Sequence, residues 1–378
     1  MRIGIVGGGI FGLSAALELA RRHHSVTVFD RAEPPAPDAA SHDHTKALRF
    51  EYGAACPLYV PLVDEARSRY RALERGWSQP LYVETGVIAL AGSFDESRHE
   101  WLSYNYLIEH GWPVELWTVD QARARFPQFS YKGIEAVTWN PQGGYLRAAE
   151  AVRATARALR EAGGTIVASA RVAAVDESAK HAAIALGGGE RFEFDTVIVA
   201  TGAWFRALLP QHAGEVSPTR QFVTYYRAPA GEEARFTPPA FPVWMHDLVT
   251  SGWYGMPLEG GLLKVAHHEP GDPADPDAAR RVDPEDRKSS RDFVRTHLPG
   301  IDPDWYAEDR GCLYAMTYDG NFLIDRVPGH ARTFVAGGGS GHGMKLGPAV
   351  GRLAADLVEG GEAPAAFRFD AVRSGRVA

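Results

Sequence analysis

The chain has 378 residues, 45% of them hydrophobic and 23% charged, a composition typical of a globular protein with about two domains. A formal net charge of −7 leaves no excess of Lys and Arg to pair with phosphates, so we expect no nucleic-acid partner. The sequence has no apolar run of membrane-spanning length, no signal-peptide pattern and only two cysteines, so we expect a cytoplasmic protein without membrane attachment or disulfide framework.

The N-terminal thirty or so residues have the pattern of a βαβ unit. Residues 2–6 form a short apolar run that ends in glycines, which is typical of a buried parallel strand. From Gly12 the apolar residues recur with helical spacing. Residues 25–29 then predict a second strand, which Asp30 closes.

The glycines between the first strand and the helix match the pattern G-x-G-x-x-G. In this pattern Gly7 permits a tight turn, Gly9 lets the backbone approach a pyrophosphate, and Gly12 lets the helix pack closely on the strand. The helix N-terminus attracts phosphates through its free N–H groups and its dipole, and Asp30 can accept from ribose hydroxyls. The motif predicts a dinucleotide site but does not decide between FAD and NAD.

Further strands and helices of the same kind occur much later in the chain. They comprise a helix and strand within 146–166, a hairpin around 187–189, strands within 194–202 and at 333–336, and a helix over 348–358. One nucleotide-binding domain must therefore be assembled from separated segments. The turn at 200–204 (Ala-Thr-Gly-Ala-Trp) recurs at strand ends in FAD proteins, which favours FAD.

The intervening stretches have a different composition. Residues 83–140 and 216–310 hold seven of the nine tryptophans, with strand-like segments at 81–83 and 222–226, whereas the polar segment 270–288 predicts a surface excursion. We therefore expect an α/β (α+β) protein with a Rossmann-type FAD-binding domain and a second domain on a mainly antiparallel sheet. The predicted FAD-binding domain comprises 1–82, 141–215 and 311–378, and the substrate domain comprises 83–140 and 216–310.

Order and spacing along nearly the whole chain resemble the monomeric sarcosine oxidase and N-methyltryptophan oxidase family of the D-amino-acid oxidase superfamily. The segments that carry this resemblance are 41–53, 253–257, 264–268, 311–314 and 340–345. It implies FAD as cofactor, a small-molecule amino-acid substrate, oxygen as electron acceptor and a monomer.

The resemblance also assigns roles to single residues. Cys312 resembles the family cysteine that lies in a flavin-facing loop and carries FAD through a thioether to the 8α-methyl group; without the resemblance it would be read as a compact buried residue. Cys56 has no such context and is expected in the core. Arg49 and Lys345 would hold the substrate carboxylate, the alternative for each being an ordinary ion pair.

Three more positions complete the catalytic set. Lys264, expected at a strand end, would favour electron transfer to oxygen by acting through a water above the flavin ring. His268 and Tyr254 would line the substrate pocket. We expect no metal site at His267 and His268, because adjacent strand residues point to opposite faces.

The full set assigned to the cofactor combines the glycine loop with these segments. It consists of Gly7, Gly9, Ile10, Phe11, Gly12, Asp30, Arg31, His42, Thr45, Lys46, Val172, Cys312, Gly341, Gly343, Met344 and Lys345. The chain departs from the family where Lys46 replaces an arginine near the flavin. It departs again where Met256 replaces a bulky aromatic residue in a region that Trp244 and Trp253 flank. Because of these departures, the resemblance does not determine which side chain the substrate carries.

The favoured activity is oxidation of a small secondary or N-methylated amino acid. A hydride would pass from the carbon next to nitrogen to flavin N5, water would hydrolyse the imine, and oxygen would be reduced to hydrogen peroxide. Oxidation of a cyclic imino acid or a primary amino acid, and a dehydrogenase with another electron acceptor, remain alternatives. A non-catalytic FAD-binding accessory subunit is the alternative from another class.

Overall fold

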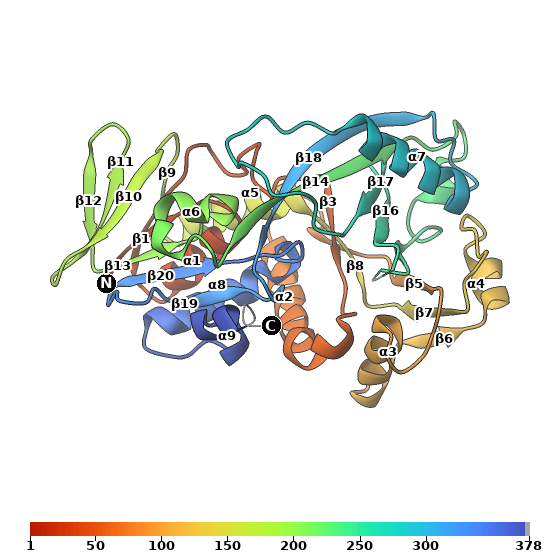
Figure 1. Cartoon of the computed structure of the whole chain (residues 1–378), viewed down its shortest axis with the longest axis horizontal. Helices are drawn as coiled ribbons and strands as arrows, with labels where there is room; N and C mark the ends of the chain where they lie inside the picture. The colour runs from red at the N-terminus through yellow and green to blue at the C-terminus, as the bar shows by residue number, and fades with distance from the viewer. Residues whose placement is uncertain (249, 375–378) are drawn as a thin grey trace.

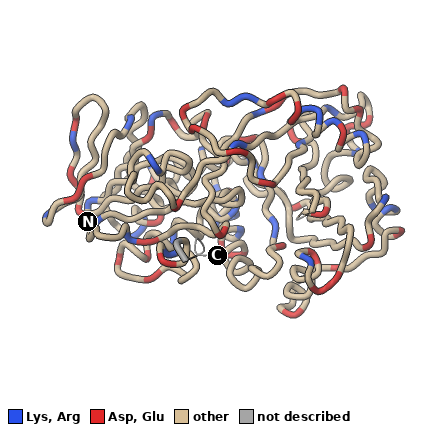
Figure 2. The backbone as a smooth tube through the Cα atoms, in the orientation of Figure 1, with Lys and Arg blue, Asp and Glu red and all other residues tan. Residues whose placement is uncertain are grey.

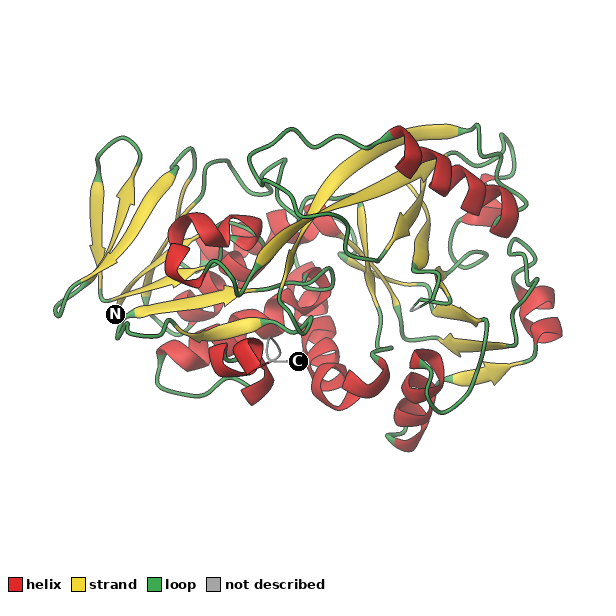
Figure 3. Ribbon diagram, viewed as in Figure 1, coloured by secondary structure: helices red, strands yellow, loops and turns green. Residues whose placement is uncertain are grey.

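The structure is a computed structural model that describes residues 1–248 and 250–374. It contains two large sheets, one in each half of the molecule (Figures 1 and 3). The first has six strands in the order β19-β20-β13-β1-β2-β9, and all neighbours are parallel except the pair β19 and β20. Its strands are β1 (Arg2–Val6), β2 (Ser25–Phe29), β9 (Thr165–Val167), β13 (Thr196–Val199), β19 (Leu323–Arg326) and β20 (Thr333–Gly337).

Both faces of this sheet are covered, as its apolar strands predict. Ile3 and Ile5 share a core with the helices α1 (Ile10–Arg21), α5 (Ala148–Glu161) and α8 (Gly347–Val358). Side chains alternate along a strand, so Val6 points to the other face and packs with a small antiparallel sheet. The strands of that sheet are β10 (Val172–Glu177), β11 (Ala182–Leu186) and β12 (Arg191–Phe194).

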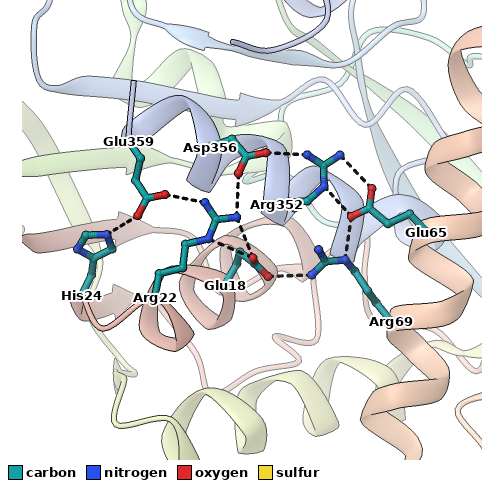
Figure 4. Close-up of polar contacts among 8 residues, drawn as sticks. All are labelled: Glu18, Arg22, His24, Glu65, Arg69, Arg352, Asp356 and Glu359. Atoms are coloured by element: carbon teal, nitrogen blue, oxygen red, sulfur yellow. Dashed lines mark hydrogen bonds and ion pairs between the residues drawn. The ribbon is translucent and has the colours of Figure 1, made fainter. Parts of the chain in front are cut away.

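Ion pairs join three helices that are distant in sequence (Figure 4). Arg22, directly after α1, reaches Asp356 on α8 at 2.8 Å, and Arg352 on α8 reaches Glu65 on α2 (Cys56–Glu74) at 2.7 Å. Arg69 on α2 closes the circle through Glu18 of α1 at 2.8 Å. Each exposed pair contributes little by itself, but a connected network fixes the relative positions of the helices behind the glycine loop.

The second large sheet has eight strands in the order β18-β14-β17-β16-β15-β5-β7-β6. All neighbours are antiparallel except β15 and β5, which pair in parallel. The strands are β5 (Val87–Ala91), β6 (Glu115–Trp117), β7 (Ala136–Asn140), β14 (Ser217–Tyr226), β15 (Val243–His246), β16 (Trp253–Glu259), β17 (Leu262–His267) and β18 (Tyr306–Met316). Helix α7 (Pro284–His297) covers this sheet, where Phe293 stacks on Trp244 and Trp253.

A three-stranded antiparallel sheet lies where the two halves meet, with β8 between β3 and β4. The strands are β3 (Thr45–Leu48), β4 (Tyr82–Glu84) and β8 (Gly144–Arg147). The remaining helices are α3 (His99–Glu109), α4 (Val119–Arg125), α6 (Phe205–Leu208) and α9 (Phe369–Ser374). Strand β18 pairs with β14 over nearly its whole length and so leads from the eight-stranded sheet to the edge of the glycine loop's domain.

The predicted fold class is confirmed, with two local corrections. The helical pattern taken to begin at residue 146 starts inside strand β8, because Leu146 pairs with Lys46 and Tyr82. The excursion predicted over 270–288 ends early, because residues from Pro284 onward form α7. The division into two domains stays a prediction; its boundary at residues 310 and 311 falls inside β18.

Two further observations concern the distribution of charged residues and the length and apolar character of the helices. Acidic and basic residues are both present in each half of the molecule (Figure 2). Over residues 1–248 and 250–374, none of the helices combines the length and apolar character that crossing a membrane would need.

Candidate active site

The glycine loop after β1 is built by close contacts that only glycine permits. Gly7 has φ +110°, and a Cβ there would lie 2.4 Å from the carbonyl oxygen of Ala200. A Cβ on Gly12 would lie 1.9 Å from the carbonyl oxygen of Gly7, so helix and strand touch at this point. At Gly9 the nearest atom to such a Cβ would be the Ser41 hydroxyl at 3.4 Å. The loop is therefore tight on two sides and open at Gly9, where it borders a cavity.

That cavity has a volume of about 440 Å³, within the size range of cofactor sites. It extends from the glycine loop to β18 and collects most residues assigned to the cofactor. Those that line it are Gly7, Gly9, Ile10, Phe11, Asp30, Arg31, Lys46, Val172, Cys312, Gly341, Gly343 and Met344. The open backbone of Gly9, the N-terminus of α1 and the mainly apolar wall fit a flavin dinucleotide.

Asp30 holds the loop as well as facing the cavity. Its carboxylate accepts the N–H of Gly8 at 2.5 Å and the N–H of Ala32 at 3.1 Å. Burial raises the pKa of this carboxyl, although both N–H donors oppose the shift. Next to it, the Arg31 guanidinium stacks on the ring of Trp204, 3.8 Å from the ring centre.

Two residues from the predicted excursion also reach this cavity. Asp277 accepts from Arg31 at 3.0 Å and from the Trp204 indole N–H at 2.8 Å. Arg280 lines the same wall, and one of its guanidinium nitrogens is buried without a hydrogen-bond partner. The segment is thus part of the site, which its polar, proline-rich composition did not reveal.

Four residues assigned to the cofactor lie outside the lining of this cavity, and one of them, Lys345, lines a second, smaller cavity instead. Gly12 serves the packing of helix on strand described above. His42 pairs its ring nitrogen Nδ1 with the carbonyl oxygen of Pro37 at 3.2 Å. Thr45 is buried and contributes its backbone carbonyl to Lys264.

A second cavity of about 50 Å³ adjoins the first, and the two share Lys46, Gly341 and Met344. Four of the five predicted catalytic residues line it, namely Arg49, Tyr254, His268 and Lys345. The opposite wall is apolar and consists of Ala47, Val243, Trp244, Met245 and Leu248. The structure thus places a small, cation-rich chamber at one end of the dinucleotide cavity.

Arg49 and Lys345 are buried there, with exposed fractions of 8% and 4%. Atom Nη1 of Arg49 lacks a hydrogen-bond partner, and Nζ of Lys345 donates only to the carbonyl oxygen of His342, at 3.3 Å. Within residues 1–248 and 250–374 neither side chain forms an ion pair. The nearby Glu51 carboxylate is engaged by Asn140.

The ring of Tyr52 lies close to both cations, with its centre 5.0 Å from the Arg49 guanidinium carbon and 5.1 Å from Lys345 Nζ. An aromatic face offsets positive charge only partly. Within the described residues no carboxylate forms an ion pair with either side chain, so the two have the chemistry to bind an anion.

Lys264 corrects a sequence expectation, because it lies inside β17 and is fully buried rather than at a strand end. It lines neither cavity. Its ammonium donates to Asp43 at 2.6 Å and to the carbonyl of Thr45 at 2.9 Å. The same carboxylate oxygen pairs with Lys46 at 2.8 Å, and the hydroxyl of Tyr225 donates to the other.

This arrangement shifts the pKa of each partner. Burial is the largest influence on Asp43 and would raise its pKa, but the two lysines outweigh it and hold that pKa well below its usual range. Burial lowers the pKa of Lys264 to about 8, against the opposing charge of Asp43. Lys46 keeps a raised pKa, because Asp43 more than offsets its burial.

Cys312 lies in strand β18, opposite Gln221 of β14, and not in the loop that the resemblance implies. It is a free, buried thiol on the wall of the larger cavity. Cys56 is also free and is fully buried in the core, as expected.

His268 and Tyr254 face the smaller cavity together. The ring of His268 accepts from or donates to the hydroxyl of Tyr314 at 3.4 Å. Burial, with Arg49 and Lys345 adding to it, lowers the pKa of His268 to about 3, so the imidazole is neutral. Burial raises the pKa of Tyr254, which therefore remains a phenol.

Of the residues singled out in describing the departures, Lys46 and Trp244 line the smaller cavity. Met256 is fully buried beside it and lines neither cavity, and Trp253 instead stacks on Phe293. The replacement at Met256 therefore acts through packing.

Besides Asp277 and Arg280, sequence reasoning missed four residues of this site: Asp43, Tyr52, Trp204 as a partner of Arg31, and His342. Asp43 and Tyr52 lie within the segment 41–53 that carried the resemblance, and Asp43 is an acid among basic neighbours there. That pattern could have identified it as a counter-ion.

Across the described part of the chain, no cluster of three or more His, Cys, Asp or Glu side chains is arranged to hold a metal.

Residues 2–357 match the family described as FAD dependent oxidoreductase (DAO). The chain is 29% identical to monomeric sarcosine oxidase of Bacillus sp. (strain B-0618), over 93% of this chain and 90% of that protein. It is 30% identical to N-methyl-L-tryptophan oxidase of Yersinia pestis (strain Pestoides F), over 93% of each.

Solved structures show the same fold at lower identity. Glycine oxidase from Geobacillus kaustophilus matches with a TM-score of 0.81 and 23% identity, covering 97% of this chain and 98% of that one. L-Proline dehydrogenase from P. horikoshii matches with a TM-score of 0.84 and 20% identity, covering 99% and 98%.

Proposed function

Because this chain belongs to the DAO family of FAD dependent oxidoreductases, we propose that it oxidises a small secondary or N-methylated amino acid and passes the electrons to oxygen. The family establishes an FAD-dependent amino-acid oxidoreductase that acts on CH–NH groups. The substrate, the acceptor and the covalent flavin link are the parts that we propose.

One observation carries the proposal: two buried cations, Arg49 and Lys345, face a small chamber without a carboxylate partner. A planar guanidinium can hold both oxygens of a carboxylate, and an ammonium adds a second charge. A bound carboxylate would therefore supply the acceptor that the Nη1 atom of Arg49 lacks. This places the rest of an amino acid between His268, Tyr254 and the cofactor cavity.

The size of the chamber favours a small substrate. Its volume of about 50 Å³ holds roughly three to five water molecules, which is close to the space of a short amino acid and too little for an indole. Trp244, Met245 and Leu248 give it an apolar wall suited to an N-methyl group or a small ring.

FAD, when bound, accepts the two electrons of the C–H bond next to nitrogen and later passes them to the acceptor. The protein's own residues orient the substrate and exclude water from the chamber. Arg49 and Lys345 hold the carboxylate, and Cys312 is the thiol that we propose for the covalent link. Held geometry can lower the barrier substantially, because the reacting bond is aligned before reaction.

One observation favours a second candidate, a dehydrogenase with an acceptor other than oxygen. Lys264, the expected promoter of oxygen reduction, is bound to Asp43 and lines neither cavity. Anaerobic bleaching of the flavin by sarcosine, proline, pipecolate or glycine, followed by admission of air, separates the two. Rapid return of the yellow colour supports an oxidase, whereas slow return supports the dehydrogenase. If none of these amines bleaches the flavin, a non-catalytic accessory subunit is favoured.

The carboxylate site itself is tested by spectral titration with a thioether acid, which has a carboxylate and no amine. Loss of a charge-assisted hydrogen bond costs about 1.5–3 kcal/mol, or roughly ten- to a hundredfold in affinity. Arg49→Met and Lys345→Met should both weaken binding by this factor. Lys288→Met, on the exposed face of α7, is the matched control and should bind normally. Normal binding in both site variants would contradict the amino-acid proposal.

A further inference from the structure

Lys345, like Arg49 beside it, differs from the two other lysines of the site because no carboxylate of the described residues forms an ion pair with it. It is 4% exposed, and the hydrogen bond that it donates is a long one to the carbonyl oxygen of His342, 3.3 Å away. Lys264 and Lys46, by contrast, both contact Asp43. Arg49 lines the same small chamber and adds a like charge.

The groups around Lys345 come from every element packed against the chamber. They are Lys46, Arg49, Glu51 and Tyr52 on and after β3, Tyr254 on β16, His268 after β17, and His342 in its own loop. His268 and His342 are neutral because burial lowers the pKa of each. Tyr52 and Tyr254 remain phenols because burial raises theirs. Among these groups, the carboxylate of Glu51 is the charged one that favours a positive charge on Lys345, and hydrogen bonds from Asn140 and from the N–H of Phe50 engage it.

Of Arg49 and Lys345, only Lys345 can reduce the repulsion between the two buried positive charges by losing a proton. A guanidinium stays charged in proteins, whereas a buried ammonium readily becomes an amine. Burial first, and the charge of Arg49 second, hold the pKa of Lys345 well below its ordinary value. Lys345 is therefore the lining cation that can give up its proton, whereas Arg49 and the Asp43-paired Lys46 keep their charge.

An amino acid arrives at neutral pH with a negative carboxylate and a positive ammonium group. Its nitrogen must lose a proton before its lone pair can drive removal of the adjacent hydride. Its carboxylate, once between Arg49 and Lys345, replaces the missing counter-charge and makes Lys345 a far better proton acceptor.

We infer that Lys345 takes up the proton that the substrate's ammonium group loses on binding. The inference rests on the proposed function, since it needs a carboxylate at Arg49 and Lys345. In this step one N–H bond of the substrate breaks and one N–H bond forms at Nζ of Lys345. No electrons are transferred, and the total charge of the complex does not change. Lys345 is thus both an anchor for the carboxylate and the base for the amine.

The test is calorimetric titration of the FAD-loaded protein with methylthioacetate, a carboxylate that brings no ammonium proton. Measured at neutral pH in two buffers of different protonation enthalpy, the heats give the number of protons taken up on binding. The wild type should take up about one proton for each ligand bound, because Lys345 must then draw it from the buffer. Trimethylglycine, whose nitrogen carries no proton, should behave in the same way.

Two variants identify the group that gains the proton. Lys345→Arg keeps a cation that is always charged, so it should still bind methylthioacetate but take up no proton. Lys345→Met should bind at least tenfold more weakly and also take up none. A second readout is the anaerobic rate at which the amine substrate reduces the flavin, measured as a function of pH. In Lys345→Arg the substrate amine must lose its proton to water. The pH profile of this rate should therefore move to higher pH.

The possible failures are distinguishable. Wild-type binding without proton uptake would overturn this inference and leave the carboxylate site intact. Proton uptake that persists in Lys345→Arg would overturn it in favour of His268 or His342. No binding of methylthioacetate to the wild type would overturn both this inference and the proposed amino-acid substrate.

Discussion

The aromatic face of Tyr52 lies 5.0 Å from the guanidinium carbon of Arg49. The same ring centre is 5.1 Å from Nζ of Lys345, and the Tyr52 hydroxyl lies 3.3 Å from Nδ1 of His342. His342 uses its Nε2 at the carbonyl of Gly320, so its Nδ1 is left to accept from the phenol. Tyr52 therefore holds the two anion-binding side chains in place before a substrate arrives.

Removing this ring should weaken carboxylate binding. A desolvated cation–π contact contributes about 0.5–2 kcal/mol, so Tyr52→Leu should lower the affinity for a thioether acid by about two- to thirtyfold. Tyr52→Phe keeps the face and loses only the hydroxyl, so its affinity should stay near wild type. Flavin-monitored titration of both variants measures the difference. Equal affinities of the Leu and Phe variants would show that the ring face has no role.

Cys312 should carry FAD covalently. It is a free thiol on the wall of the cofactor cavity, whereas Cys56 is enclosed in the core. We expect the denatured wild-type protein to retain one FAD by mass spectrometry, and Cys312→Ser to retain none. Cys56→Ser is the matched control and should retain the flavin. An unmodified mass for protein made in flavin-replete cells would exclude the link.

Lys264 should govern the reaction of the reduced flavin with oxygen, if the oxidase proposal is right. Lys264→Met should slow reoxidation by orders of magnitude and change reduction by substrate much less. Because burial lowers the pKa of Lys264 to about 8, its charge is present below that pH and lost above it. Wild-type reoxidation, followed in a stopped-flow apparatus, should therefore slow as the pH rises through about 8. A flat profile would mean that this lysine does not act on oxygen.

Asp43 should matter more for stability than either lysine that it binds. Asp43→Ala leaves Lys264 and Lys46 as neighbouring buried cations, which should destabilise the fold by about 3–5 kcal/mol. Lys264→Met removes one cation and leaves the pair of Asp43 and Lys46, so its cost should be smaller. Denaturant unfolding of the two variants gives the comparison. A smaller loss of stability in Asp43→Ala than in Lys264→Met would contradict this account.

The loop of the dinucleotide site was predictable from the sequence because its physics is local. Gly7 has φ +110°, and a Cβ on Gly12 would meet the carbonyl oxygen of Gly7 within the same loop, so these two requirements appear directly in the local sequence. The strands at 196–199 and 333–336 were also recognisable, because their apolar runs are fully buried.

The rest depended on which segments meet in three dimensions. Asp277 reaches Arg31 from 246 residues away, and Lys264 reaches Asp43 from 221 residues away. No local pattern records such pairs. The resemblance to a family identified Lys264 and Cys312 as candidate site residues. We expected Lys264 at a strand end and Cys312 in a loop, but both lie inside strands.

Strand β1 pairs and packs with elements from much later in the chain, and this has a consequence for synthesis on the ribosome. Its partner β13 begins at Thr196, and the helix packed on α1 is α8, which begins at Gly347. The glycine loop is thus made first and completed almost last. A nascent chain that ends before Ala336 would lack the wall of the larger cavity that residues 336–344 contribute, and also α8, which the ion pairs of Arg22 and Arg352 anchor. Cofactor capture should therefore be a late event, and a truncated chain should leave the ribosome without flavin.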